Sequence, residues 1–295
     1  MKKIFTYTCI VACALAFCSC AEDAPRAKSI FEDPDRSSIS EIEQWLLQNY
    51  TYPYNIQYQY KLQDVETDRS YEVVPAIPDK ALALAKILKH MFYESYDELL
   101  GVNFLRTHSQ RVIHVVGSGA YTTSSVLKGT AESGMKITLY LVNDLTATSV
   151  NQELLSEYYL KTMFHEFSHI LHQKKAYTSA FRLITPADYL YNEWNSAGNT
   201  LEIALQKGFI SKYARDEPDE DFVEIIAFYV VKPDGWWEEQ MAIAGEPGAS
   251  LLAAKLDIVK AYLKDVWELD IDYLRAVVQR RFGELNNLDL TDLLK

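Results

Sequence analysis

The sequence predicts an α+β fold, in which a small mixed sheet precedes a helical C-terminal lobe. Three observations favour it. Helix-like and strand-like patterns are interspersed between residues 38 and 142. A long helical pattern occupies residues 151–175. Beyond residue 218 the apolar residues recur at helical spacing with no strand pattern among them. Strands gathered in one part of a chain and helices in another are typical of α+β proteins.

The first 19 residues have the composition of a secretion signal. Lys2 and Lys3 precede an apolar run at residues 7–17, which is too short to span a membrane as a stable helix. A small residue, Ser19, stands directly before Cys20, an arrangement that resembles the lipidation site of bacterial lipoproteins. We therefore expect a signal peptide at residues 1–19 and an acylated Cys20.

Two alternatives to this cleavage site remain open. Cys18 is a competing lipidation point, although the bulky Phe17 before it is unfavourable. An ordinary signal peptide would instead release a free secreted protein. In the lipoprotein interpretation, residues 20–37 are a polar, proline-containing tether.

Composition limits what the mature chain can be. All four cysteines lie at or before Cys20, so the body has no disulfide and no cysteine-type zinc site. Without residues 1–19, the chain has 27 basic and 41 acidic side chains, and this net negative charge disfavours binding to nucleic acid and to anionic lipid. Glu22 and Asp23 resemble the acidic residues that send some lipoproteins to the outer face of the outer membrane. The expected location is the outer membrane, exposed at the cell surface, with a periplasmic orientation as the alternative.

The part before residue 142 is expected to hold two helices and three strands. The helices are predicted at residues 38–49, with Ser38 or Ser40 able to cap, and at residues 78–95. The strands are predicted at residues 54–62, 111–116 and 136–142, the last two joined by a glycine- and serine-rich connection.

The helical pattern at residues 151–175 carries an H-E-x-x-H motif, His165-Glu166-Phe167-Ser168-His169. Residues four apart lie one turn apart on the same helix face, so His165 and His169 can offer two imidazole nitrogens to one metal ion. Glu166 is rotated by roughly 100° around the axis, from where its carboxylate can reach the open side of the ion. This zincin arrangement predicts a Zn²⁺ cofactor, with Glu166 as the general base for the attacking water. The alternative is a solvated helix with two incidental histidines, which the apolar flanks disfavour.

A catalytic zinc needs a third protein ligand. One class of H-E-x-x-H enzymes uses a His ten residues after the first, but that position is Lys175 here. Another class uses a Glu from a later helix, and the segment that begins at Pro218 offers Glu220 and Glu224 on one face. One carboxylate can bind zinc while the other holds a ligand imidazole by its second N–H.

Other polar residues near these motifs have weaker assignments. His172 is expected to support His169 or to lie at the surface, because a third ligand from the same helix would have to bend back. Asp219 and Asp221 are expected to be solvated residues of an acidic helix start. Tyr213 could donate a hydrogen bond to the oxyanion of a tetrahedral intermediate, or be one ordinary tyrosine of 20.

Taken together, these motifs resemble the catalytic region of the anthrax lethal factor family of gluzincin-type zinc peptidases. That family has H-E-F-G-H, a Tyr seven residues before a zinc-binding Glu, and a second Glu four residues after it. The resemblance implies that the zinc ligands are His165, His169 and Glu220. It also implies Glu166 as the general base, Tyr213 as the donor to the oxyanion, and Glu224 as the carboxylate that supports a ligand. Ser168 replaces the family's Gly, a small change that is expected to leave the ligand geometry intact.

Most of the mature chain is also similar to zinc-binding metallopeptidase lipoproteins associated with outer-membrane nutrient import of the starch-utilisation type. The shared features are the lipoprotein start, residues 165–173, the Tyr189 and Trp194 stretch, residues 209–214 and residues 220–224. The resemblance implies a zincin-like catalytic domain, which we place at residues 38–295.

Within that domain we expect an N-terminal lobe up to residue 175 and a helical lobe from residue 176. Residues 176–199 are loop-like and aromatic, and either line a cleft or cover the core. Helices are predicted at residues 236–244, 248–267 and 270–282. In zincins the strand before the metal helix often forms the sheet edge that pairs with a peptide substrate, but residues 136–142 could equally be an interior strand.

The sequence thus predicts an outer-membrane-tethered zinc metallohydrolase that acts on a peptide or protein substrate. An import complex is a further partner that the resemblance implies. The alternative is a binding or accessory lipoprotein of a nutrient-uptake complex, in which the metal is structural or vestigial. A fourth coordination position filled by Glu224 or His172 would support that alternative. Hydrolysis of another amide or an ester stays open.

Overall fold

The computed structural model describes residues 39–62, 71–121, 126–127, 129–132, 135–146 and 152–291. The expected signal peptide, Cys20 and the tether at residues 20–37 lie outside these ranges and stay predictions. From Ser40 onward the chain forms one compact unit. Within the described ranges, we find no helix that combines the length and the apolar character needed to cross a membrane.

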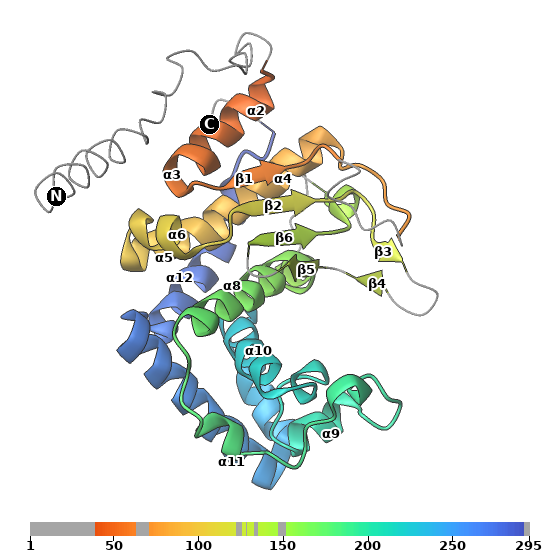
Figure 1. The fold of residues 1–295 in the computed structure, drawn as a ribbon, viewed down its shortest axis with the longest axis vertical. Coiled ribbons are helices and arrows are strands. Elements are labelled where there is room, and N and C mark those ends of the chain that lie inside the picture. Colours follow the sequence, from red (N-terminus) through yellow and green to blue (C-terminus); the bar gives the residue numbers. More distant parts are fainter. Residues whose placement is uncertain are drawn as a thin grey trace, which may run out of the picture. The chain divides into compact units, whose positions relative to one another are not determined.

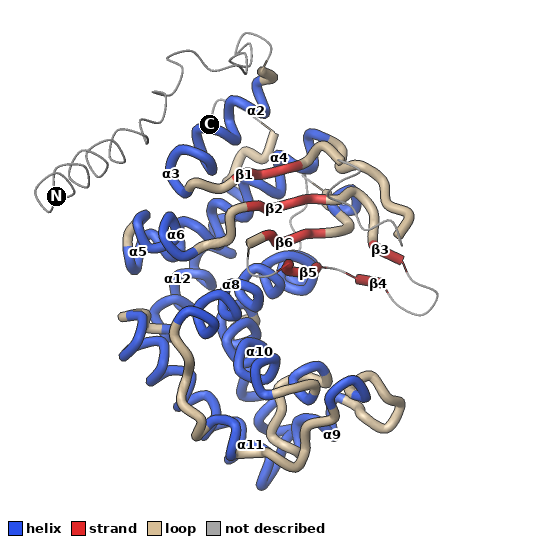
Figure 2. The backbone as a smooth tube through the Cα atoms, viewed as in Figure 1, coloured by secondary structure: helices blue, strands red, loops and turns tan. Residues whose placement is uncertain are grey.

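Helices and strands are interspersed up to residue 146, as predicted (Figures 1 and 2). The helices of this part are α2 (Glu41–Leu46), η2 (Leu47–Thr51), α3 (Tyr52–Tyr54), α4 (Pro78–Leu88), η4 (Lys89–Tyr93), α5 (Glu94–Leu100), α6 (Val102–His108) and η5 (Val142–Asp144). The strands are β1 (Gln57–Gln59), β2 (Val112–Val115), β3 (Ala120–Tyr121), β4 (Val126–Leu127), β5 (Gly129–Glu132) and β6 (Lys136–Leu139).

Local sequence explains where the first helices begin and end. Ser40 caps α2 in a capping box with Glu43, whose carboxylate accepts the Ser40 N–H at 2.9 Å. The helical path continues through α3 and stops at Asn55, which adopts a left-handed φ of 58°. The strand predicted at residues 54–62 is therefore wrong at its start, and only Gln57–Gln59 pairs as β1.

Among the described residues, four strands form a sheet in the order β1-β2-β6-β5, and β3 and β4 pair separately. The first three run parallel, and β5 pairs antiparallel with β6. β6 therefore lies inside the sheet, and the edge next to it is formed by β5. The sequence pattern left both positions open for residues 136–142, and the interior one is confirmed.

The second half of the chain is helical (Figure 2). Its helices are α7 (Gln152–Leu155), η6 (Ser156–Leu160), α8 (Lys161–Lys174), η7 (Phe181–Leu183), η8 (Tyr191–Glu193), α9 (Leu201–Gln206), η9 (Tyr213–Arg215), α10 (Pro218–Val231), α11 (Trp236–Trp267), α12 (Ile271–Glu284) and η10 (Leu285–Asn287). The helical path of α11 is interrupted at Gly245 and Glu246, where the sequence predicted a break.

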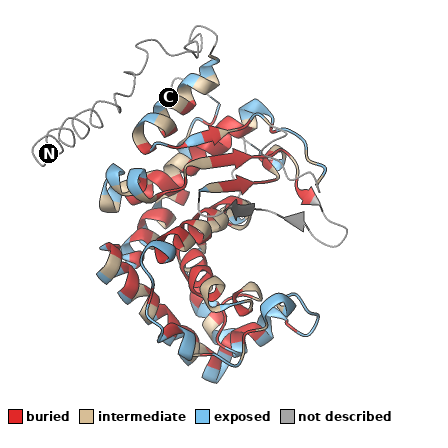
Figure 3. Cartoon of the chain, in the orientation of Figure 1, coloured by how far each residue is buried: buried red, intermediate tan, exposed pale blue. Residues whose placement is uncertain are grey.

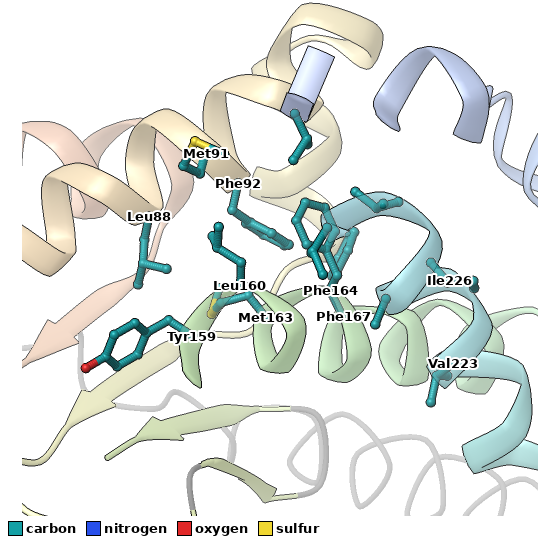
Figure 4. Close-up of a cluster of buried hydrophobic side chains, with 14 of the residues drawn as sticks. Leu88, Met91, Phe92, Tyr159, Leu160, Met163, Phe164, Phe167, Val223 and Ile226 are labelled. Atoms are coloured by element: carbon teal, nitrogen blue, oxygen red, sulfur yellow. The ribbon is translucent and has the colours of Figure 1, made fainter. Parts of the chain in front are cut away.

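The core lies where α4 and η4, α8 and α10 meet. Figure 4 shows Phe92 of η4 against Phe164 and Phe167 of α8, with Val223 and Ile226 of α10 beside them. The three phenylalanines are fully buried, and their rings meet edge to face at 5.0 and 5.6 Å between centroids. Burial runs along both α8 and α10 (Figure 3). The packing thus fixes α8 and α10 against each other, and polar residues of both helices lie close together where the two helices meet.

Candidate metal centre

The H-E-x-x-H motif lies in α8, as predicted. One side of this helix is buried in the core through Phe164, Phe167 and Leu171. Ser168, which stands where the lethal factor family has Gly, is also buried, and its hydroxyl donates to the Phe164 carbonyl at 2.7 Å. Because this hydroxyl already donates its hydrogen bond within the helix, Ser168 does not need the neighbouring polar side chains as hydrogen-bond acceptors.

The two histidines of the motif converge on one carboxylate of α10. The Nε2 atom of His165 lies 3.1 Å from Glu220, and the Nε2 atom of His169 lies 3.3 Å from it. Ligand atoms that surround a tetrahedral zinc at 2.0–2.2 Å are about 3.3–3.6 Å apart. Both distances to Glu220 are therefore within a few tenths of an ångström of the spacing of a zinc site, and two imidazoles with a carboxylate are the donors that catalytic zinc uses.

The other ring nitrogen of His165 is held by a buried carboxylate. Its Nδ1 atom lies 2.9 Å from Glu224, which is fully buried. Glu224 also accepts a hydrogen bond from the Ser211 hydroxyl at 2.6 Å and pairs with Lys161 at 3.1 Å. Burial raises the pKa of Glu224, but the Lys161 charge and the His165 and Ser211 hydrogen bonds outweigh it and lower the pKa to about 2. The carboxylate therefore stays charged and orients the His165 ring.

His169 is supported differently. Its Nδ1 atom lies 2.9 Å from the Nε2 atom of His172, one turn further along α8. His172 is buried, so of the two positions expected for this residue the supporting one is observed.

Glu166 and Tyr213 lie next to these groups. Single ligand atoms of His165, Glu166 and His169 fall within 4.8 Å of one another. Burial raises the pKa of Glu166, although the two neighbouring imidazoles oppose the shift. The Tyr213 ring stacks on His165 at 6.0 Å between centroids and is braced by Trp194 at 4.9 Å. Burial and the adjacent Glu220 charge raise the pKa of Tyr213 well above its usual value, so its hydroxyl keeps its proton.

The charge balance of the centre favours a cation. Burial alone would lower the pKa of His165, but its hydrogen bonds with Glu220 and Glu224 raise it to about 9. Burial would raise the pKa of Glu220, but hydrogen bonds with the imidazoles of His165 and His169 lower it below its usual value. Surroundings that stabilise an extra positive charge on His165 would also stabilise a divalent ion bound by its neutral form. The residues present therefore fit zinc in both spacing and charge.

The first turn of α10 differs from the sequence-based expectation. Asp221 was expected to be solvated, but it is fully buried and forms an ion pair with the equally buried Lys255 of α11 at 2.7 Å. Tyr189 also donates to Asp221, at 2.8 Å. Asp219 is only partly exposed, and it accepts hydrogen bonds from Tyr177 and Arg182. The carboxylates on either side of Glu220 are thus both held by other side chains, which anchors the first turn of α10.

Sequence reasoning missed three participants in this arrangement: Lys161, Ser211 and Lys255. Lys161 could have been found, because it lies one turn before His165 on the same helix face. Ser211 lies within a segment that the family resemblance marked, without a role. Lys255 carries no local signal, since only the fold brings α11 to the start of α10.

A helix that presents two imidazoles to the carboxylate of a neighbouring helix, beside a small mixed sheet, defines a metal-binding α+β protein. The sequence matches a family described as "Putative zinc-binding metallo-peptidase" over residues 35–272, and the chain belongs to that family. Zinc is accordingly its cofactor.

A solved structure supports the same assignment. The chain is similar to a crystal structure described as a putative zinc-binding metallo-peptidase from Bacteroides caccae, with 40% sequence identity and a TM-score of 0.77. The match covers 90% of this chain and 100% of the other. A search of curated proteins found no match.

Proposed function

We propose that this chain is a zinc peptidase in which His165, His169 and Glu220 hold the ion. The observation that carries the proposal is the convergence of the two Nε2 atoms on Glu220 at 3.1 and 3.3 Å. That ligand set, with a Glu from a separate helix, is of the gluzincin type within a zincin-like fold.

The chain's own residues can carry the proton transfers of peptide hydrolysis. Zinc held by these three residues would act as a Lewis acid, which would polarise the scissile carbonyl and lower the pKa of water. Glu166 takes a proton from the attacking water and passes it to the leaving amine. Tyr213 donates a hydrogen bond from its hydroxyl to the oxyanion that the carbonyl oxygen becomes when water attacks the carbonyl carbon.

The hydrogen bonds to the Nδ1 atoms of His165 and His169 favour a catalytic metal over a structural one. An accessory protein with a structural metal would use Glu224 or His172 as a fourth ligand. Both residues instead contact Nδ1 atoms, whereas the Nε2 atoms face Glu220. Glu224 and His172 would therefore not complete the coordination of an ion held by His165, His169 and Glu220, and a structural site would have no use for a base such as Glu166.

Strand β5 is the proposed docking edge for an extended peptide. It is the last strand of the sheet, antiparallel to β6, and it contacts α8. Figure 1 shows it beside that helix. A peptide that adds to this edge as a further strand would run past the metal centre with its main chain hydrogen-bonded.

The location is a further part of the proposal. Cys20 tethers the chain to the outer membrane, with the catalytic domain at the cell surface next to a nutrient import complex. The N-terminal sequence and the family resemblance support this location.

The first test of the proposal is metal content and hydrolysis. Purified residues 21–295 are expected to carry one zinc per chain by mass spectrometry and to cleave members of a peptide library. A chelator should stop the cleavage, and added zinc should restore it. A chain that carries zinc and cleaves no peptide would favour an accessory protein with a structural metal. A chain that takes up no zinc would exclude the peptidase and leave an accessory protein with a vestigial site.

Glu220→Ala is expected to abolish stoichiometric zinc binding, because it removes a ligand. Glu224→Gln keeps all three ligands but loses the charge behind His165, so we expect one zinc at saturating metal and an affinity about 10–100-fold weaker. Chelator competition measures both affinities. Glu217→Ala is the matched control, since Glu217 is exposed at the start of the same helix and should bind zinc normally. Retention of zinc by Glu220→Ala would show that another residue is the third ligand.

Tyr213→Phe is expected to lower kcat about 10²–10³-fold with little change in KM, because a donor to the oxyanion acts only in the transition state. Zinc content should not change. Tyr273→Phe is the control, since Tyr273 is exposed on α12. Equal kcat values for the Tyr213→Phe and wild-type proteins would remove Tyr213 from the mechanism.

A further inference from the structure

The two histidines of the metal centre are backed by different chemical groups. The Nδ1 atom of His165 meets the carboxylate of Glu224, whereas the Nδ1 atom of His169 meets the imidazole of His172, each at 2.9 Å. When Nε2 binds a metal it carries no proton, so the ring proton must be on Nδ1. His169 then donates through Nδ1, and His172 must accept through Nε2.

The His172 ring is fixed in the place that this hydrogen bond requires. It is three residues after His169 on α8, where helix side chains are neighbours. It is buried, and it packs against Tyr177 at 5.7 Å and Phe222 at 6.4 Å between ring centroids. Tyr177 and Phe222 are themselves stacked in parallel at 4.0 Å.

This packing connects the support of His169 to the helix that carries Glu220. Phe222 is two residues beyond Glu220 in α10, and Tyr177 donates a hydrogen bond to Asp219 in the same turn. The His172 ring therefore packs against Phe222, which lies in the same turn of α10 as Glu220. A change at His172 is transmitted to His169 through one hydrogen bond.

We propose that His172 is a positioning residue that accepts the Nδ1–H of His169, fixes its tautomer and turns its Nε2 atom toward Glu220. The inference rests on the proposed role of His169 as a ligand. A neutral acceptor polarises an imidazole less than a carboxylate does, so the hydrogen bond behind His169 is the weaker of the two that support the histidine ligands.

Substitutions at His172 test this role through zinc affinity, measured on the full-length chain by competition with a chelator. His172→Leu removes the acceptor and is expected to weaken zinc binding about 10–100-fold. His172→Gln can place an amide oxygen near the position of Nε2 and should stay within a few-fold of wild type. His172→Asn is too short to reach and should resemble the Leu variant. The Gln and Asn pair carries the test if the Leu variant does not fold.

A second readout separates positioning from general stability. In the zinc-loaded wild type, the His169 Nδ1–H should give a slowly exchanging imidazole proton signal in NMR. The signal should persist in His172→Gln and disappear in His172→Asn. His108→Leu is the control: His108 packs against Phe104 and Trp267, away from the ligands, and its loss should leave zinc affinity unchanged.

Two outcomes would overturn the inference while leaving the proposed function intact. One is wild-type zinc affinity in the Leu and Asn variants. The other is equal weakening in Gln and Asn with the His169 proton signal unchanged in both. Failure of the wild-type chain to bind zinc would instead overturn the proposed function itself, and with it the role of His172.

Discussion

Glu166→Gln is expected to lower peptide hydrolysis about 10²–10⁴-fold and to leave zinc content unchanged. The amide keeps the size of the side chain but cannot take a proton from the attacking water. Glu166 lies close to His165 and His169, yet the bridging carboxylate between their Nε2 atoms belongs to Glu220. The base can therefore be removed without removing a ligand. The measurement is kcat for a cleaved peptide, with zinc determined on the same sample.

A matched control for this variant is available on the preceding turns of the same helical segment. Glu157 belongs to η6 and pairs at the surface with Lys232 at 3.7 Å, so Glu157→Gln should hydrolyse peptide at the wild-type rate. A fully zinc-loaded Glu166→Gln protein with wild-type kcat would exclude Glu166 as the base. Loss of zinc together with activity would mean that Glu166 helps to hold the ion.

Lys255→Met is expected to reduce the free energy of unfolding by about 3–5 kcal/mol, because it leaves the buried carboxylate of Asp221 without its counter-charge. Both side chains are inaccessible to solvent, and the ammonium group also donates to the Gly208 carbonyl at 2.7 Å. Burial raises the pKa of Asp221 and lowers that of Lys255, and their mutual attraction opposes both shifts. Urea unfolding monitored by circular dichroism measures the effect.

Two further variants separate this effect from a general loss of a lysine. Lys255→Met combined with Asp221→Asn removes both charges and should recover part of the lost stability. Lys260→Met, also in α11, removes a lysine whose ion pair with Asp272 is exposed to solvent, and should cost less than about 1 kcal/mol. Equal losses for Lys255→Met and Lys260→Met would show that the buried pair contributes no more than a surface one.

Much of the metal centre could be predicted from sequence because its geometry is local. His165 and His169 are one helical turn apart, and so are Glu220 and Glu224, so helix periodicity alone aligns each pair. Pro218 marks the start of α10, and Gly245 marks the break in α11, because each residue limits the backbone in a known way.

The features that sequence could not predict depend on contacts between distant segments. The acidic start of α10 looks solvated in sequence, but Lys255, 34 positions after Asp221, makes burial of that carboxylate possible. Strand β5 falls within the glycine- and serine-rich connection and is defined by its pairing with β6. α6 and α9 are only seven and six residues long, too short for periodicity to reveal.

The position of Glu220 on a different helix from the histidines has a consequence for the folded chain as a whole. With Glu220 as the proposed ligand, zinc joins α8 to α10 across 55 positions of sequence. A cross-link over a loop of that length restricts the unfolded chain by roughly 4 kcal/mol in the entropic model used for disulfides. Because every cysteine lies within the first 20 residues, the chain after residue 20 cannot be cross-linked through sulfur. The ion would then be the cross-link between α8 and α10, so that loss of the metal would lower the stability of the fold as well as disrupt the site.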